Sequence, residues 1–421
     1  MKRIKLEITA LSPLAIAGKK PGSVSEAEDH IPGSVIRGAI ASQILQLSGI
    51  NDQNLATDGG DFTTLFLNDK AAIFQSAYPA VAKSDSNSQV VDEDVMVFPA
   101  TAVSSKTNPG FKPKGNGVFD TLIDRFYADI YNFPYDPSCP TDKGRVEPFT
   151  GFYSKSKDSQ TQYRTHSNTT RFLTRVGINR RRATSEEEIL YSIEVLNESF
   201  AETPQKETWY PVVYRSAIYV NDNKLAESLT KFINDNYQVF RLGGATSRGL
   251  GKVEIKAKIE EATTDVETRI NAFNSRLRNR CNDWQIFSQN NNFLENHTYF
   301  ILDLQSDAIL TEHWRRTTVI SATMLQQFTG VDDSSLKLHT AYSTYNYRSG
   351  WNAAWGLMKD IELVTNRGAV YLFSVDKGNE KIWIDKLKDL ELNGVGDRTC
   401  EGFGQVQICN EFHNVLREDA K

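Results

Sequence analysis

The sequence is poor in cysteine and histidine, and the few that occur are not arranged as metal ligands. Its 421 residues include four cysteines and six histidines, with no Cys-x-x-Cys pair and no His-x-x-x-His pair. Structural zinc sites keep close ligand spacings, and catalytic metal motifs place two histidines on one helix face. We therefore expect neither a metal site nor a cofactor.

The sequence also lacks an excess of positive charge and any long apolar run. Lys and Arg number 48 against 53 Asp and Glu, so the formal net charge is -5. This excludes a protein that coats nucleic acid through a generally basic surface. No stretch approaches the ~18 apolar residues of a membrane span, and charges stand near the N-terminus where a signal peptide needs its apolar core. We expect a cytoplasmic protein without membrane contact.

What the sequence does contain is an internal repeat. Residues 243–255 (GGATSRGLGKVEI) align without a gap on residues 396–408 (GDRTCEGFGQVQI), with six of thirteen positions identical. In each copy a glycine-rich loop leads into alternating apolar residues, which is the pattern of a half-buried strand. Each copy also begins with a short alternating strand, near residues 5–9 and 301–305. The chain therefore consists of two related modules, unless the likeness is only that of two glycine turns.

The order of predicted elements gives the fold class. Strands separated by helices in a split βαβ order predict an α+β fold in which a ferredoxin-like unit occurs twice. The modules are predicted at residues 1–260 and 295–412. Apolar residues at helical spacing between them predict a linking amphipathic helix over residues 264–283. The first module carries insertions at 83–94, 104–117 and 136–165, which we interpret as surface segments because they are polar and rich in turn residues.

The first glycine loop has the composition of an anion site. Glycine permits positive φ and close approach of another chain, and successive amide N–H groups can form an anion-binding nest. The sequence therefore predicts that a phosphate backbone is bound by Gly243, Gly244, Gly249 and Gly251, with charge-assisted contacts from Arg241, Arg248 and Lys252. A nucleotide P-loop is excluded because Leu250 stands where that motif has Lys. The alternative is a tight turn whose glycines serve only geometry.

The second glycine loop has fewer cationic side chains that could bind phosphate. Arg398 remains a candidate RNA-binding residue, but Glu401 stands at the position of Arg248 and Gln405 at that of Lys252. A loop that has lost its cations keeps only the geometry of the turn.

Two further segments carry arginine. Residues 30–40 predict a helix capped by Ser34 with Arg37 in its first turn, which favours an anion and could share a surface with the glycine loop. Residues 171–196 predict a projecting hairpin whose arginines could stack on bases or pair with phosphates. These arginines are Arg171, Arg175, Arg180, Arg181 and Arg182. The alternative is a solvated hairpin in which three glutamates, at 186–188, balance the charge.

Single histidines and an aromatic cluster are the remaining candidates. His30 or His166 could act as a general base for RNA cleavage, although isolated histidines are commonly structural. Aromatic residues between Tyr342 and Trp355 could form a base-stacking platform, a protein interface or partly buried packing.

These motifs together resemble the RAMP superfamily of CRISPR-associated proteins. The resemblance rests on IPGSVIRG (31–38), on a hairpin with RVGI (175–178) and LYSI (190–193), and on RGLGKV (248–253). With RGAVYLF (367–373) and RTCEGFG (398–404), the chain looks most like the double-RAMP subunit of type III-D effector complexes.

The resemblance implies a role in RNA-guided immunity. Subunits of this five-type Cas class grip the repeat-derived 5′ tag of the crRNA and cap the complex. Their partners are the large polymerase-like subunit and the seven-type backbone subunits, and target RNA is a further candidate partner. The positions that match the family's RNA-facing motifs are Ser34, Arg37, Gly243, Gly244, Ser247, Arg248, Gly249 and Gly251. We expect a noncatalytic RNA-binding subunit. The alternatives are a metal-independent endoribonuclease that processes precursor crRNA and a purely structural subunit without RNA contact.

Overall fold

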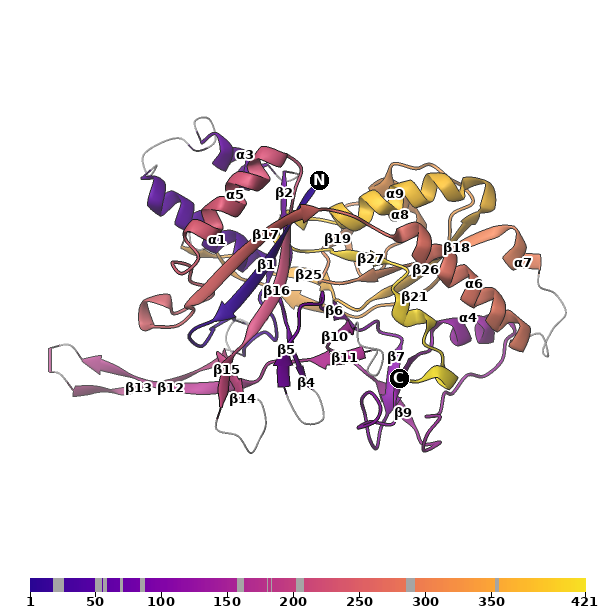
Figure 1. Ribbon diagram of the computed structural model, residues 1–421, viewed down its shortest axis with the longest axis horizontal. Helices are drawn as coiled ribbons and strands as arrows, with labels where there is room; N and C mark the ends of the chain where they lie inside the picture. The colour runs from indigo at the N-terminus through magenta and orange to yellow at the C-terminus, as the bar shows by residue number, and fades with distance from the viewer. Residues whose placement is uncertain are drawn as a thin grey trace.

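The computed structural model describes most of the chain, namely residues 1–17, 26–49, 55, 59–68, 71–83, 88–156, 163–179, 181–182, 184–201, 208–284, 292–352 and 356–421. It is a mixed α/β structure whose sheets are all antiparallel. Figure 1 shows two lobes side by side, with a long hairpin projecting from the lobe that contains the N-terminus. None of the described helices is long and apolar enough to cross a membrane.

The first lobe is built on a sheet of order β17-β1-β16-β2, with β3 also paired to β16. In β1 (Lys2–Ala10) the residues Ile4, Leu6 and Ile8 are buried while their neighbours face the other side, because side chains alternate along a strand. Helix α5 begins at the capping residue Asp222, whose carboxylate accepts a hydrogen bond from the Leu225 amide at 2.9 Å. The other elements of this lobe are β2 (Ala72–Phe74), β3 (Tyr78–Pro79), β16 (Val213–Val220), β17 (Val253–Glu261), α1 (Gly33–Ser48), α3 (Asp61–Leu67) and α5 (Asn223–Asp235).

The second lobe repeats this arrangement. Its sheet has the order β27-β18-β26-β21, and its elements follow each other in the same sequence of strand, helix, strand, strand, helix, strand. They are β18 (His297–Leu304), α8 (Ala322–Thr329), β21 (Lys337–Tyr342), β26 (Val370–Asp376), α9 (Glu380–Asn393) and β27 (Val406–Ile408). Small pairs border the sheet, formed by β19 (Leu310–Glu312) with β20 (Arg315–Thr317), β22 (Tyr345–Arg348) with β25 (Glu362–Thr365), and β23 (Trp351–Asn352) with β24 (Leu357–Met358).

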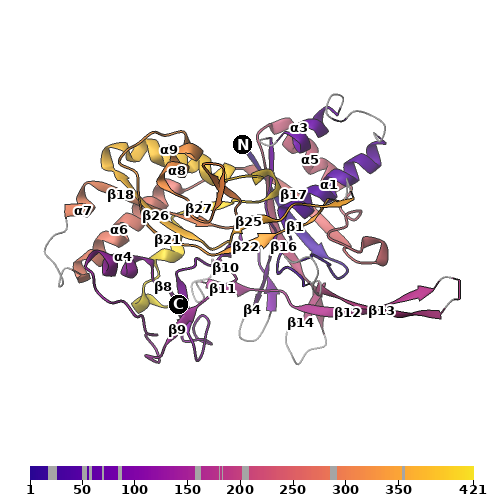
Figure 2. The ribbon, with the colours of Figure 1, turned by 180° about the vertical axis from the view of Figure 1, so that it is seen from behind.

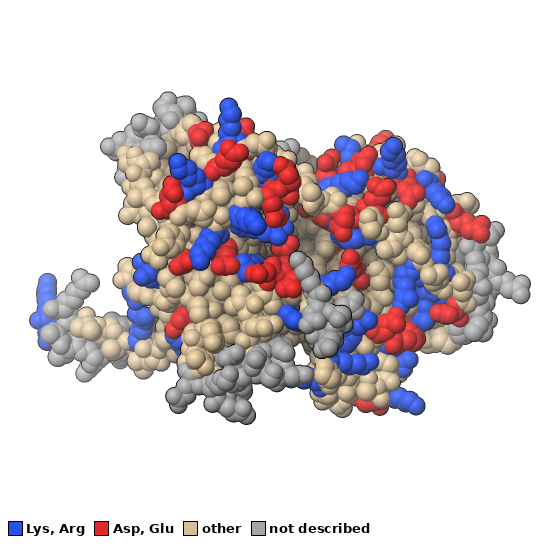
Figure 3. All heavy atoms as spheres, viewed as in Figure 1, with Lys and Arg blue, Asp and Glu red and all other residues tan. Residues whose placement is uncertain are grey.

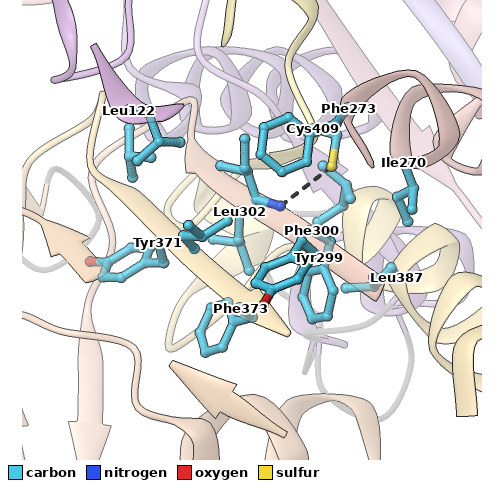
Figure 4. Packing of buried hydrophobic residues seen from close by; sticks show 14 of the residues in the cluster. Leu122, Ile270, Phe273, Tyr299, Phe300, Leu302, Tyr371, Phe373, Leu387 and Cys409 are labelled. Carbon is cyan, nitrogen blue, oxygen red and sulfur yellow. Dashed lines mark hydrogen bonds between the residues drawn. The ribbon is translucent and has the colours of Figure 1, made fainter. Parts of the chain in front are cut away.

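Helix α6 (Val266–Trp284) begins and ends close to the predicted 264–283 and belongs to the core of the second lobe. Its residues Ile270, Phe273 and Leu277 are buried against β18 and α9, and Figure 4 shows Ile270 and Phe273 beside Phe300 and Leu387. The short helix α7 (Asn292–Glu295) precedes β18. The segment between the two sheets is thus a packed helix and not only a connection.

The insertions agree only in part with the sequence-based interpretation: most of their described residues are exposed or half-buried, but Phe152, Tyr153 and Tyr163 belong to the core. Residues between β3 and β12 form two small sheets from β4 (Val81–Lys83), β5 (Ser88–Val90), β6 (Met96–Val97), β7 (Ala102–Ser105), β8 (Val118–Asp120), β9 (Val146–Pro148), β10 (Phe152–Lys155) and β11 (Tyr163–His166). Tyr153 and Tyr163 are buried there against Phe412 from the C-terminal segment. Aromatic residues spaced through polar sequence gave no periodic signal, so this second apolar cluster was not predicted.

Helix α4 (Leu122–Ile130) joins the insertion to α6. The hydroxyl of Tyr127 donates to the carbonyl oxygen of Leu277 at 2.6 Å, and Arg280 pairs with the buried Asp124 at 2.6 Å. The hairpin β12 (Thr170–Asn179) and β13 (Thr184–Leu196) then projects away from the first lobe, followed by β14 (Ser199–Ala201) and β15 (Trp209–Pro211). The predicted hairpin is therefore present; Figure 2 shows its extent from behind.

Candidate nucleic-acid interface

The two glycine loops have the same backbone conformation. Ala245 and its equivalent Arg398 are both left-handed, with φ 53° and 58°, and Gly249 and Gly402 are left-handed at φ 85° and 91°. Each loop contains a single 3-10 turn, at Thr246–Arg248 and Thr399–Glu401. The sequence repeat is therefore a structural repeat, and the glycines occupy positions that disfavour side chains.

Each loop is bound to the segment after the first strand of its own lobe in the same way. The Gly244 amide donates to the Ala15 carbonyl oxygen at 2.8 Å, and the Asp397 amide donates to that of Ile309 at 2.9 Å. These bonds attach both loops in the same way, so the difference between the loops lies in their side chains and surroundings.

The first loop is open to solvent. Gly244, Thr246, Ser247, Arg248 and Gly249 are all exposed. The amides that begin a 3-10 turn have no partner within it, and within the described chain no acceptor is recorded for those of Thr246 and Ser247. Their N–H groups are available to an external anion.

The hairpin brings a second arginine and a tyrosine to this loop. The guanidinium of Arg248 donates to the Tyr191 hydroxyl at 2.7 Å and lies 5.6 Å from the centroid of that ring. Arg175, on the paired strand, donates to the Arg248 carbonyl oxygen at 3.3 Å. We call Arg175, Tyr191 and residues 246–249 the open-loop cluster. Tyr191 was not predicted as a site residue, although strand pairing places it opposite Arg175.

The remaining predicted cations lie outside this cluster. Arg171 pairs with Glu198 at 2.8 Å, and Arg241 donates to the carbonyl oxygen of Phe240 at 3.0 Å near Lys252 at the base of the loop. Arg181 and Arg182 are exposed at the hairpin tip. Arg180 lies outside the described residues.

The start of α1 differs from its prediction. The cap residue is Pro32, no side chain caps the helix, and Ser34 stands inside the first turn. Arg37 lies over the ring of Phe66 on α3 and donates to its carbonyl oxygen. Neither residue joins the open-loop cluster.

The N-terminus of α1 is instead covered by the second glycine loop. A Cβ on Gly33 would lie 2.8 Å from the Glu401 carbonyl oxygen and 3.0 Å from Gly402 Cα. The expected common surface between this helix and the first loop is therefore wrong, because a loop from the other lobe occupies the helix end. Sequence spacing holds no information about such a contact between lobes.

The Glu401 side chain is held by two cations, while the backbone of this loop makes the contact with Gly33. Glu401 accepts hydrogen bonds from Arg398 at 2.6 Å and from Lys359 at 3.0 Å. Although burial raises the pKa of Glu401, these two cations lower it overall, so the carboxylate stays ionised. Arg398, predicted to bind RNA, is occupied by this ion pair.

Other ion pairs between the lobes surround His30. Arg367 binds Asp29 at 2.6 Å, and Arg348 binds Glu28 at 3.1 Å. Burial and the charge of Arg367 lower the pKa of His30. Glu28, Asp29 and His30 are close enough to share a metal ion, but the two arginines already neutralise both carboxylates. We interpret the cluster as a set of ion pairs that hold the two lobes together.

His166 is also buried. Its Nε2 lies 2.8 Å from the Ser154 hydroxyl, and burial lowers its pKa to about 4. In the aromatic cluster, Tyr345 and Tyr347 are exposed, with ring centroids 6.2 Å apart.

The surface carries charges of both signs, in agreement with the similar numbers of basic and acidic residues. Figure 3 shows Lys and Arg side chains interspersed with Asp and Glu over both lobes. Attraction for an anionic polymer would therefore be local to a site such as the open-loop cluster.

The comparisons with known proteins identify the family. The model of the RAMP superfamily matches residues 7–254, which is more than half of the chain. The chain therefore belongs to the RAMP superfamily. A search of the curated proteins finds no match.

Solved structures similar to this chain come from type III CRISPR complexes. A chain in the structure of the type III-B Cmr-beta complex bound to cognate target RNA and AMPPnP is 12% identical, with 91% of this chain and 93% of that chain covered and a TM-score of 0.37. A chain of the Csm3–Csm4 subcomplex from the type III-A interference complex is 14% identical, with 90% and 96% covered and a TM-score of 0.33. Oligomeric Cmr4 from Pyrococcus furiosus is 11% identical, with 62% and 99% covered and a TM-score of 0.26.

Proposed function

We propose that this protein is a noncatalytic RNA-binding subunit of a type III CRISPR effector complex, of the double-RAMP kind found in type III-D. Its first module would hold the 5′ tag of the crRNA through the open-loop cluster. The observation that carries this proposal is the charge difference between two loops of identical backbone. The loop with Glu401 packs against the N-terminus of α1, whereas the loop with Arg248 is exposed and suits an anion.

The two modules are proposed to be ferredoxin-like domains at residues 1–260 and 295–412, connected through the helix predicted at 264–283. In each lobe the chain order is βαββαβ, and the fourth strand, the first, the third and the second lie side by side. Each lobe also has its own glycine loop of the same conformation, which supports duplication of one unit.

The chemistry at the open-loop cluster would be phosphate binding. Amides of Thr246 and Ser247 would donate to phosphate oxygens, and Arg248 would add charge. Tyr191 holds the Arg248 guanidinium in place, so less side-chain entropy is lost when a phosphate binds. Because the net charge is -5, we expect modest affinity for free RNA and stronger retention in the assembled complex.

The second module is proposed to serve assembly. Its glycine loop is occupied within the chain, and exposed apolar residues remain on its β22–β25 region, including Tyr345, Tyr347 and Ile361. The proposed partners are the large polymerase-like subunit and the seven-type backbone subunits.

The test is RNA binding by matched arginine variants. Replacing Arg248 by alanine should weaken binding of a crRNA tag oligonucleotide about five- to tenfold and lower the slope of log K against log salt by about 0.7, as expected for one lost phosphate contact on a single strand. Arg171→Ala is the control, because Glu198 already neutralises that guanidinium. Equal effects of the two substitutions would contradict the proposal.

The endoribonuclease alternative has a separate test. Purified protein incubated with repeat RNA in EDTA should leave the RNA intact, because His30 and His166 are both buried and a general base must reach its proton. Ordered cleavage that is lost in His30→Ala or His166→Ala would replace the noncatalytic assignment.

A further inference from the structure

The tip of a small hairpin in the second lobe carries the most exposed large apolar side chain among the described residues. The hairpin joins β19 to β20 through a turn of two residues, His313 and Trp314. Trp314 is 99% exposed, whereas the next most exposed large apolar residue, Leu190, is 72% exposed. Single apolar side chains on a surface are common, so the conformation and surroundings of Trp314 decide whether it has a function.

The backbone of this turn suits neither of its residues. The φ angle is 46° at His313 and 64° at Trp314. Two-residue turns with positive φ at both central positions normally contain Asn, Asp or Gly, and positive φ is an outlier for a bulky side chain. The sequence therefore keeps an indole where glycine would form the same turn with less strain. Strained positions of this kind cluster at functional sites.

The base of the hairpin is bound to the rest of the second lobe. Arg316 on β20 forms ion pairs with Asp397 of the second glycine loop at 2.6 Å and with Glu362 of β25 at 2.7 Å. The Thr311 hydroxyl donates to the same Asp397 carboxylate at 3.0 Å, and Leu310 is fully buried. Because these contacts already order the hairpin, less conformational entropy is lost when a partner encloses its tip.

The neighbouring exposed side chains favour a protein partner over RNA. Between residues 295 and 412 seven large apolar residues are described as exposed, and one of them, Ile382, lies on α9. The other six lie on β19–β20, β22–β25 and β23–β24 or next to them: Trp314, Tyr345, Tyr347, Leu357, Met358 and Ile361. Aliphatic side chains gain nothing from phosphates, and a stacked base covers only one face of an indole. A pocket on a protein can enclose the whole ring.

Charge at the tip narrows the chemistry of that pocket. Arg315, next to Trp314, is exposed and forms no ion pair with the described residues. Glu312, which is paired with Arg315 across the hairpin, accepts a hydrogen bond from the Ser321 hydroxyl. The tip thus presents an indole beside a cation without a partner. Trp and Arg are also the residues enriched among those that dominate the binding energy of protein interfaces.

We propose that Trp314 anchors the second lobe to a neighbouring protein subunit by inserting into an apolar pocket. A carboxylate at the rim of that pocket would pair with Arg315, because interfaces are complementary in charge. The inference deepens the assembly role proposed for the second module, and it rests on that role for the source of the partner, another subunit of the effector complex. RNA is the competing occupant.

Photocrosslinking in the reconstituted complex identifies the occupant. The full-length protein carries Trp314→p-benzoylphenylalanine and is assembled with the other subunits and crRNA before irradiation. Mass spectrometry should find an adduct between position 314 and one other protein subunit. An adduct with RNA, or no adduct in the assembled complex, would overturn the proposal.

The affinity for the crosslinked subunit gives a quantitative test. Trp314→Ala should weaken the association of the two purified proteins at least tenfold, as expected for an interface anchor. Trp209→Ala is the matched control, because Trp209 is 65% exposed but lies in the first lobe, and it should leave the association unchanged. An unchanged affinity in Trp314→Ala would overturn the proposal.

Trp314→Gly separates binding from folding. Glycine adopts positive φ without strain, so this variant should unfold at an equal or higher urea concentration than the wild type. It should nevertheless lose affinity for the partner as Trp314→Ala does. A Trp314→Gly protein that binds its partner normally would overturn the proposal even if Trp314→Ala fails to fold.

RNA binding is measured separately on the same proteins. Neither Trp314 variant should change the affinity for the tag oligonucleotide, which Arg248→Ala should lower. Weakened subunit association in Trp314→Ala together with unchanged tag affinity in Arg248→Ala would retain this interface and reject the proposed RNA-binding role. Normal association in Trp314→Ala together with lowered tag affinity in Arg248→Ala would reject the interface and retain that role.

Discussion

A buried histidine between two aspartates gives a quantitative prediction for stability. His413 is fully buried; its Nε2 lies 2.9 Å from Asp303 on β18, and its Nδ1 lies 3.2 Å from Asp120 on β8. Burial alone would lower the pKa of His413, but the two carboxylates raise it to about 10. The imidazolium therefore connects the C-terminal segment, the insertion and the second lobe.

The expected loss in the free energy of unfolding follows from the shift in the pKa of His413. A rise from 6.5 to about 10 corresponds to roughly 5 kcal/mol at ~1.36 kcal/mol per pH unit, and breaking a buried ion pair costs about 3–5 kcal/mol. Because the folded-state pKa is raised, the stabilisation is complete below pH 6.5 and is lost as the pH rises through 10. His413→Gln should therefore lower the free energy of unfolding by about 3–5 kcal/mol at acidic pH and by much less at alkaline pH.

Urea unfolding of both proteins across this pH range measures the difference. His297→Gln is the matched control, because that histidine is on the surface of β18 and should change the midpoint little. A His413→Gln effect below about 1 kcal/mol, or one that does not depend on pH, would refute the reasoning.

Two further predictions concern the contact between α1 and the second loop. Gly33→Ala should lower the free energy of unfolding by about 1–3 kcal/mol, because its Cβ would crowd the Phe74 carbonyl oxygen of β2 as well as the backbone of Glu401 and Gly402. Gly38→Ala, where the added carbon meets no atom within 4 Å, should be neutral or stabilising, and equal midpoints for the two variants would contradict this packing. Glu401→Arg should destabilise the chain by about 2 kcal/mol, because it replaces the carboxylate that pairs with Arg398 and Lys359 by a third cation; an unchanged melting temperature would show that these ion pairs do not stabilise the loop.

The repeat and its backbone were predictable because glycine spacing encodes dihedral angles. The left-handed positions at Gly249 and Gly402, and the turn each one ends, follow from local sequence. The helical period of Val266, Ile270, Phe273 and Leu277 likewise identified α6, since one apolar face is a local property.

What could not be predicted depends on contacts between distant segments. Ser34 has the residue type of a helix cap, yet the helix begins at Gly33, whose missing side chain lets Phe74 and the second loop pack against it. The meeting of Arg175 with Arg248 and the burial of Tyr153 against Phe412 also join residues far apart in the chain. No spacing rule relates such residues, so the sequence indicated the chemistry of the site without its full composition.

The central claim is that the first glycine loop, and not the second, holds the RNA backbone. Ultraviolet crosslinking of crRNA in the purified effector complex, followed by mass spectrometry of the crosslinked peptides, measures this directly. We predict crosslinks in residues 246–249 and none in the equivalent residues 399–402, which contact α1. Crosslinks confined to the second loop, or absent from the first, would contradict the account.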